Sequence, residues 1–352
     1  MIPNSFRFQK HIPGLLAALN PVLIVLDIVL IPFCLIGGLL FYLIRLIDIN
    51  HLESMKFTKM ILRWIGVYPV LDHFYDPLVN LRHLKKPFDH KRDLPGFDLN
   101  IQSQLNLLDK FDFNADFETW PMHFQGRLEY YYINFSFLPV DAQYLHNMIR
   151  LYKPKRFVEI GCGFSTLVSA NALSINKARN AKFTCQHTCI EPYRHEWLNH
   201  LDIQMIKEPV QNLDKAIFEH LEANDILFID SSHMIKPQGD VLYEYLEILP
   251  VLKPGVIVHI HDIYTPKDYP EKHIVSQVKF WNEQYLLEAF LSSNSNFEIL
   301  GALNYLRDNH HDALAARCPA LKDKRIIEKA KEKIACSSLD FLETTSFWIQ
   351  KK

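Results

Sequence analysis

The stretch "RFVEIGCGFSTLVSANAL", residues 156–173, joins a short apolar run, an acid and two closely spaced glycines, and an apolar helical pattern follows. Glycines at such a turn let the backbone approach a ligand, and the helix start presents free N–H groups. The stretch therefore predicts a nucleotide-binding turn, or a turn that needs its glycines only because it is tight. The dinucleotide fingerprint needs a third glycine where Thr166 stands, which disfavours a nicotinamide cofactor.

Apolar, strand-like runs alternate with helical patterns through the rest of the chain. The runs are "RFVEI", "TCIE", "IQMIK", "DILFID", "GVIVHIHD", "FEIL" and "SFWIQ". This alternation predicts a mostly parallel sheet with helices on both faces. Because such sheets bind ligands beyond the carboxyl ends of their strands, the residues just after each run are the candidates for a site.

Acids and histidines stand at these positions. Glu191 follows the second run, where an acid can accept hydrogen bonds from ribose hydroxyls. Asp230 and His233 follow the fourth run, and His261 and Asp262 follow the fifth. Histidine can take a proton from a hydroxyl, and Asp with His can hold a divalent ion. The alternative is that the histidines only cap a helix or pack within the sheet.

Four motifs in fixed order carry a resemblance to a known family. "VEIGCGFST", "IEPY", "DILFIDSSH" and "LKPGVIVHIHDIY" resemble the class I S-adenosylmethionine-dependent methyltransferases over roughly residues 125–350. The resemblance implies a seven-stranded, mostly parallel Rossmann-like sheet with helices on both faces, whose last strand is antiparallel and lies beside the fifth. It implies that the cofactor is bound by Glu159, Gly161, Gly163, Ser165, Thr166, Glu191 and Asp230.

The resemblance also bears on metal and catalysis. Metal-dependent O-methyltransferases of the catechol type keep a ligand acid at the position of Asp230, and a lysine base where this chain has His233. After the fifth strand they have Asp-Asn, where His261 and Asp262 stand here. Asp230 and Asp262 are therefore the candidate ligands of a divalent cation such as Mg²⁺. We expect His233 or His261 to deprotonate an acceptor hydroxyl, with Asp262 orienting the base or holding the cation.

The N-terminal quarter predicts a retained membrane segment rather than a cleaved signal peptide. Residues 21–47 hold about 24 nearly unbroken apolar residues, enough to cross a bilayer core at roughly 1.5 Å per residue, with Asp27 as the single acid. Pro32 with Gly37 and Gly38 offers break points for a re-entrant hairpin instead of a spanning helix.

A basic amphipathic helix is predicted next, in "MKFTKMILRWIGVY", residues 55–68. It lies either in the headgroup layer or docked on the globular domain with a solvated basic face. The predicted organisation is a membrane segment over 1–50, this helix and a linker over 51–100, and the methyltransferase domain over 101–352.

Two further segments flank the motifs. Aromatic residues at 130–137 precede the helix that leads into the first strand, and they cover the cofactor or only pack on the sheet. Residues 271–291 predict one amphipathic helix, with Trp281, Tyr285 and Phe290 in the core.

Composition limits the function. Lys plus Arg (38) nearly balances Asp plus Glu (40), which gives no field that favours nucleic acid. The resemblance, taken with the N-terminal apolar segment, implies a membrane-associated, S-adenosylmethionine-dependent methyltransferase, and we expect its catalytic domain to face the cytoplasm. Its expected acceptor is a sugar or other hydroxyl compound near the membrane, as a small molecule or a lipid-linked saccharide. The rival functions are a nicotinamide-dependent oxidoreductase and a non-catalytic membrane-bound scaffold of the same fold.

Overall fold

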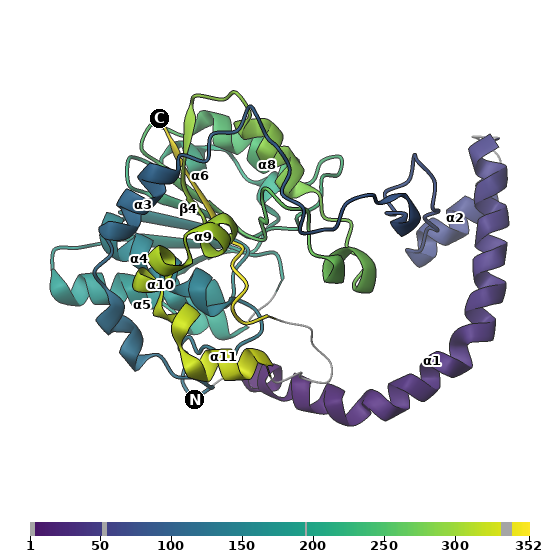
Figure 1. The fold of residues 1–352 in the computed structure, drawn as a ribbon, viewed down its shortest axis with the longest axis horizontal. Coiled ribbons are helices and arrows are strands. Elements are labelled where there is room, and N and C mark those ends of the chain that lie inside the picture. Colours follow the sequence, from purple (N-terminus) through teal and green to yellow (C-terminus); the bar gives the residue numbers. More distant parts are fainter. Residues whose placement is uncertain (1–3, 51–54, 194–195, 332–339) are drawn as a thin grey trace.

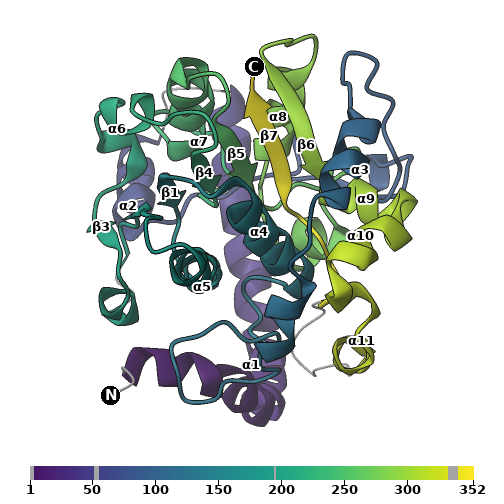
Figure 2. The same cartoon turned by 90° about the vertical axis from the view of Figure 1, so that its left-hand side faces the viewer.

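A seven-stranded sheet forms the centre of the computed structural model, which describes residues 4–50, 55–193, 196–331 and 340–352. Its strand order is β3-β2-β1-β4-β5-β7-β6, and every pair is parallel except those of β7 with β5 and β6. All seven predicted strands are confirmed, as is the antiparallel last strand beside the fifth (Figure 2). The strands are β1 (Arg156–Ile160), β2 (Gln186–Ile190), β3 (Gln204–Ile206), β4 (Ile226–Ile229), β5 (Ile257–Ile260), β6 (Phe297–Ala302) and β7 (Phe347–Lys351).

Helices cover both faces of this sheet (Figures 1 and 2). Successive strand residues point to opposite faces, so Phe157 packs in one apolar core with α4 and α5, and Val158 in a second core with residues 241–252 and α8. The helices of the domain are α3 (Ile101–Asp109), α4 (Pro139–Tyr152), α5 (Phe164–Arg179), α6 (Ala216–Glu219), α7 (Asp240–Tyr243), α8 (Glu283–Leu291), α9 (Leu303–Asn309), α10 (His311–Arg317) and α11 (Lys324–Lys331).

The segment 271–291 differs from the prediction of one helix. A short helical turn covers Lys272–Ser276, and α8 begins only at Glu283. Between them the backbone N–H groups of Asn282 and Glu283 donate to the carbonyl of His233, at 3.0 and 3.3 Å. These tertiary hydrogen bonds replace helical ones, and a sequence period cannot show them.

The N-terminal apolar segment lies in one continuous helix, α1 (Asn4–Asn50), which Figure 1 shows extending away from the α/β domain. Pro32, Gly37 and Gly38 do not break this helix. The structure therefore has a continuous helix here and not the alternative re-entrant hairpin. Within the described residues, its part Pro21–Ile47 is the one stretch long and apolar enough to cross a membrane, and none of that stretch is buried.

The second predicted helix is α2 (Lys56–Ile65), which ends where Gly66 adopts a φ of +82°. The last residues of the predicted range 55–68, including Tyr68, therefore lie beyond the helix. The apolar side chains Phe57 and Trp64 are 80% and 86% exposed, whereas Leu62 is buried. The apolar face is thus open in this structure rather than docked on the domain.

Candidate active site

The glycine turn after β1 is shaped by its contact with the end of β4. Gly161 has a φ of +79°, and a Cβ atom there would lie 1.9 Å from the carbonyl oxygen of Asp230. Any side chain at this position would push the two strand ends apart. At Gly163 a Cβ would meet nothing within 4 Å, so this part of the turn faces open space.

Two cavities adjoin this turn and share three of the predicted cofactor residues, Gly161, Glu191 and Asp230. One has a volume of about 260 Å³ and is also lined by Gly163 and Ser165, with Phe137 and Trp197 as apolar walls. The other measures about 500 Å³ and continues past β2 and β4; its further walls include Pro192, Tyr193, Val210 and Ser231. Phe137 shows that the aromatic segment both reaches a cavity and packs on the sheet.

Glu191 is held by the backbone at the end of β2. Its carboxylate accepts hydrogen bonds from the N–H of Cys162 at 3.2 Å and the N–H of Tyr193 at 2.8 Å. The side chain is therefore fixed between the glycine turn and the chain beyond β2, at the junction of the two cavities.

Glu159 and Thr166, also predicted to bind the cofactor, support the turn from inside the protein. The fully buried Glu159 carboxylate accepts from Ser165 Oγ at 2.5 Å and lies 3.1 Å from His187 Nε2. Thr166 Oγ1 accepts from the N–H of Gly163 at 3.0 Å. Neither residue is among the described residues that line the two cavities.

The histidines and acids after β4 and β5 converge as predicted. His233 Nε2 lies 3.3 Å from Asp230 Oδ1 and 3.5 Å from Asp262 Oδ2. His261 Nδ1 lies 3.5 Å from Asp262 Oδ1, and its Nε2 lies 3.7 Å from the buried Asp141. Asp230, His233, His261 and Asp262, from two strand ends, thus form one cluster, and Asp230 also lines both cavities.

The carboxylates determine the protonation of the cluster. Burial alone would lower the pKa of both histidines, but Asp230 and Asp262 raise the pKa of His261 to about 9. Hydrogen bonds to Asp230 and Glu283 raise the pKa of His233 well above its ordinary value. The pKa of Asp262 is lowered by His261 and His233 despite burial. The site therefore favours imidazolium beside carboxylate.

The same cluster offers a ligand set for a cation. Asp230, His233 and Asp262 each present one ligand atom, and these atoms lie within 4.8 Å of one another. Carboxylate oxygen with imidazole nitrogen suits several divalent ions. The predicted pair Asp230 and Asp262 is brought together, and a divalent cation there stays a prediction.

Two buried carboxylates of the site could not be found from sequence. Asp141 lies in α4 and accepts from the N–H groups of Thr345 and Ser346, and Glu283 opens α8 behind His233. Both positions belong to apolar helical patterns, and their partners lie far along the chain. The sequence contains no local signal for either contact.

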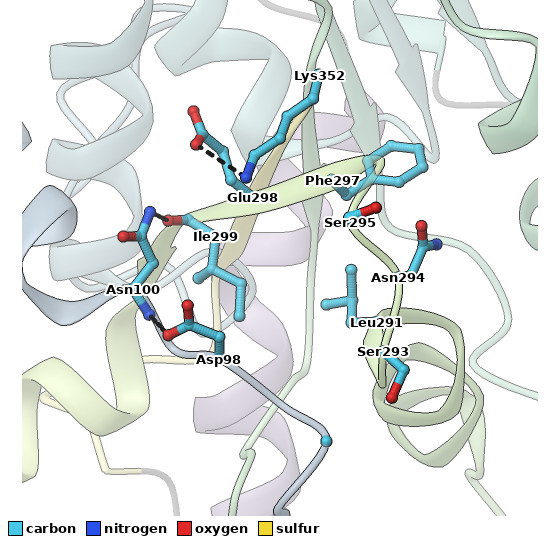
Figure 3. A pocket seen from close by; sticks show the side chains of 11 residues that line it. Asp98, Asn100, Leu291, Ser293, Asn294, Ser295, Phe297, Glu298, Ile299 and Lys352 are labelled. Carbon is cyan, nitrogen blue, oxygen red and sulfur yellow. Dashed lines mark hydrogen bonds and ion pairs between the residues drawn. The ribbon is translucent and has the colours of Figure 1, made fainter.

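A third cavity, of about 380 Å³, lies at the opposite edge of the sheet, where β6 begins (Figure 3). Asp98 and Asn100 line one side, and Ser293 and Asn294 line the other. It contains none of the predicted site residues. The carboxyl ends of the parallel strands therefore remain the place of the candidate site.

The sheet order and the glycine turn after β1 are those of a Rossmann-like methyltransferase fold, and comparison with known proteins supports a methyltransferase domain. A family model described as a methyltransferase domain matches residues 158–263. An uncharacterized protein of Archaeoglobus fulgidus is 34% identical over 199 residues, which is 51% of this chain and 88% of that protein. The chain therefore belongs to the family of this archaeal protein, and its residues 158–263 match a methyltransferase domain.

Two solved structures resemble parts of the chain. The O-methyltransferase TomG from Streptomyces achromogenes, involved in tomaymycin synthesis and solved with SAM, is 15% identical, with a TM-score of 0.32 over 55% of this chain and 80% of that one. An O-methyltransferase from Bacillus cereus solved with SAH is 12% identical, with a TM-score of 0.31 over 56% of this chain and 82% of that one.

The buried pair of Glu159 and His187 predicts a pH-dependent stability. Burial alone would lower the pKa of His187, but hydrogen bonds to Cys189 and Glu159 raise it to about 9. A histidine with a raised folded-state pKa stabilises the fold fully below about pH 6.5, its unfolded value, and this contribution is lost as pH rises through about 9. The contribution is on the order of 3 kcal/mol.

We expect His187→Gln to remove this part of the pH dependence. The measurement is the free energy of unfolding by urea at pH 6.5 and pH 9, for the full chain in detergent. The exposed His200 gives the control His200→Gln, which should retain the wild-type dependence. Equal losses of stability in the wild type and in His187→Gln would show that the Glu159 contact is not an ion pair.

Proposed function

We propose that the chain binds S-adenosylmethionine in the two cavities beside Gly161 and methylates a hydroxyl group. The observation that carries this proposal is the junction at Asp230. There the cavities of about 260 and 500 Å³ meet the cluster of His233, His261 and Asp262. Cofactor and acceptor would thus share one strand end.

The described residues suit this cofactor. Gly163 leaves open space in which backbone can contact a ligand, and Glu191 is fixed where it can accept from ribose hydroxyls. Ser165 and Asp230 complete the polar walls of the smaller cavity. S-adenosylmethionine supplies an electrophilic methyl group when bound, so the protein has to hold an oxygen in line with it and remove a proton.

We assign His233 as the base that removes the proton of the acceptor hydroxyl. Its Nε2 atom faces Asp230 and Asp262, whereas its Nδ1 atom points back into the protein. Because its raised pKa favours the imidazolium, His233 must first lose its own proton; the neutral ring can then take the hydroxyl proton, and the two aspartates stabilise the imidazolium that forms. Asp262 holds His261 from the other side, so His261 contributes charge and orientation to the same cluster.

The helices α1 and α2, called the anchors below, suggest the class of acceptor, whereas the cavities do not. Apolar α1 and the exposed apolar face of α2 suit a bilayer and its headgroup layer. We further propose that the domain faces the cytoplasm, where S-adenosylmethionine is available. A lipid-linked saccharide or another glycan precursor would meet a hydroxyl-directed site there. A nicotinamide oxidoreductase is disfavoured because Thr166, which caps α5, stands where the third glycine is needed.

Cofactor binding is the first test. In calorimetric titration of the full chain in detergent, we expect S-adenosylmethionine to bind and NAD not to bind. Glu191→Ala should weaken binding by roughly tenfold or more, because it removes charged hydrogen-bond acceptors. Glu208→Ala, which removes an exposed acid on the loop after β3, should leave binding unchanged. Binding of NAD alone would overturn the proposal.

Methyl transfer is the second test. Membrane lipids and glycolipids extracted from the source cells are incubated with S-adenosylmethionine labelled in its methyl group. Wild-type chain should label a saccharide-containing lipid, and His233→Ala should lower the rate about a hundredfold, because a positioned base contributes on that scale. Binding without transfer to any acceptor in the extract would support the scaffold instead.

The anchors predict two separable modes of membrane attachment. Deleting residues 1–50 should leave weak binding to phosphatidylcholine vesicles that phosphatidylserine strengthens, because α2 carries Lys56, Lys59 and Arg63. Adding Phe57→Ser and Trp64→Ser should weaken vesicle binding about tenfold or more. Leu246→Ser, at an exposed leucine of the domain, is the control. Vesicle binding unaffected by the α2 substitutions would exclude α2 as an anchor.

A further inference from the structure

We propose that residues 71–92, called the strap below, bind the surface of an anionic bilayer and hold the candidate site beside it. The inference rests on the proposed function, because it requires that α1 enters a membrane. The strap lies within the predicted linker, but it contacts α1 at one end and the α/β domain at the other. Figure 1 shows it, in dark blue, crossing between the two.

One end of the strap is joined to α1 by a two-point ion pair. Arg45 donates to both carboxylate oxygens of Asp76, each at 2.8 Å, and each side chain is only 14% exposed. Asp76 Oδ2 also accepts from the N–H of Leu71 at 3.1 Å, which closes the turn 71–76. Arg45 lies near the end of the apolar stretch Pro21–Ile47. The ion pair therefore places the turn at the level where this stretch would leave the hydrocarbon core.

The turn presents two adjacent aromatic rings. Phe74 and Tyr75 are each 81% exposed, and their ring centroids lie 3.9 Å apart. The His73 ring lies 4.6 Å from the Phe74 ring, and the N–H of Tyr75 donates to His73 Nδ1 at 3.3 Å. Exposed apolar area is unfavourable in water, whereas aromatic rings are favoured at the headgroup level of a bilayer. A bilayer interface beside α1 is therefore the environment that suits these rings.

The charge of the strap fits anionic lipid. Its exposed cations are Arg82, Lys85, Lys86 and Lys91, and its exposed acids are Asp72 and Asp89. Asp76 is already paired with Arg45. The exposed surface of the strap is therefore net positive, and cations close to an anionic membrane surface each strengthen binding to it. A bilayer that contains phosphatidylserine complements both the rings and the cations.

The other end of the strap is fixed to the loop that follows β5. The backbone N–H and Nε of Arg92 donate to the carbonyl of Pro266 at 3.0 and 3.2 Å, and Nη2 donates to the carbonyl of Lys267 at 3.0 Å. The same guanidinium lies 2.6 Å from the buried carboxylate of Glu288. Asp262 of the candidate site stands four positions before Pro266. The strap therefore links the end of α1 to the strand end that carries the site.

An exposed apolar residue beside the site supports the same orientation. Val278 is 49% exposed, and its φ of +50° is rare for a β-branched residue. Trp281, three positions later, packs its ring on His233 with a centroid distance of 4.5 Å. The ammonium of Lys279 lies 3.5 Å from the centre of the Trp281 ring. An apolar side chain and a cation thus stand together near the candidate base, as they do in the strap.

Photo-crosslinking to lipid tests the proposal. Phe74, Val278 or Val251 is replaced in turn by p-benzoylphenylalanine in the full chain, in vesicles of equal parts phosphatidylcholine and phosphatidylserine. We expect lipid adducts, detected by mass spectrometry, from positions 74 and 278. Val251 is the control, because it is exposed and precedes β5 at the end of the sheet opposite the site, and it should give none. Membrane-bound chain without adducts at 74 or at 278, or with equal adducts at 251, would overturn the proposal.

Charge exchange tests the ion pair that holds the turn. Asp76→Asn should lower the adduct yield at position 74 roughly fivefold, because it removes a two-point, partly buried charge pair. Arg45→Asp combined with Asp76→Arg should restore the yield. The matched control Asp89→Asn removes an exposed acid and should leave the yield unchanged. A yield that Asp76→Asn does not lower, or that the exchange does not restore, would contradict the fixed turn.

Flotation of the vesicles separates the two possible failures. Every variant is first assayed for co-flotation with the vesicles, and we expect the full chain to float. A full chain that does not float would overturn the membrane attachment in the proposed function, and the strap with it. A chain that floats without adducts at positions 74 and 278 would overturn the strap alone and leave α1 as the attachment.

Discussion

The contact between Gly161 and the carbonyl of Asp230 is the constraint on which the site depends. β1 and β4 are neighbours at the centre of the sheet, and the chain departs toward β2 on one side and toward β5 on the other. The strand order therefore reverses here, which is where open α/β sheets bind ligands. Because Gly161 has no side chain, the turn that faces both cavities also contacts the strand end that carries Asp230.

A second constraint is electrostatic. Buried charges are costly unless they are paired, and the site buries His233, His261, Asp141 and Glu283 within one region. Each histidine meets a carboxylate on both of its nitrogens, which offsets the loss of solvation. The arrangement favours a protonated imidazole, so a histidine of this cluster can accept a proton from a hydroxyl only after it has lost its own.

Local pattern predicted most of the fold. Seven apolar runs correspond to seven strands because each is short, buried and bounded by turn or helical residues. The order of the strands, with β7 between β5 and β6, came from the resemblance and could not follow from periodicity alone. The segment 271–291 does not form the single helix that its apolar spacing favours, because the N–H groups of Asn282 and Glu283 bond to the His233 carbonyl instead.

The candidate site was predictable only where its residues follow a strand. Asp230, His233, His261 and Asp262 stand at strand ends, and the sheet brings such positions together whatever the intervening sequence. Glu283 and Asp141 act from helices, and their contacts depend on how those helices pack. Glu159 shows the converse: it belongs to the motif, but its side chain points to Ser165 and His187 inside the protein.

Exposed aromatic side chains near the end of α1 also bear on the acceptor. Arg45, at the end of α1, pairs with both carboxylate oxygens of Asp76 at 2.8 Å, and Phe74 and Tyr75 beside that acid are each 81% exposed. The ion pair therefore joins the end of the apolar helix to a second exposed aromatic group. Large exposed apolar surfaces are rare on soluble monomers and typical of membrane contact. The proposed membrane attachment would let the enzyme sample acceptors in the bilayer plane, where tethering raises their effective concentration, and this supports the proposal of a lipid-linked acceptor.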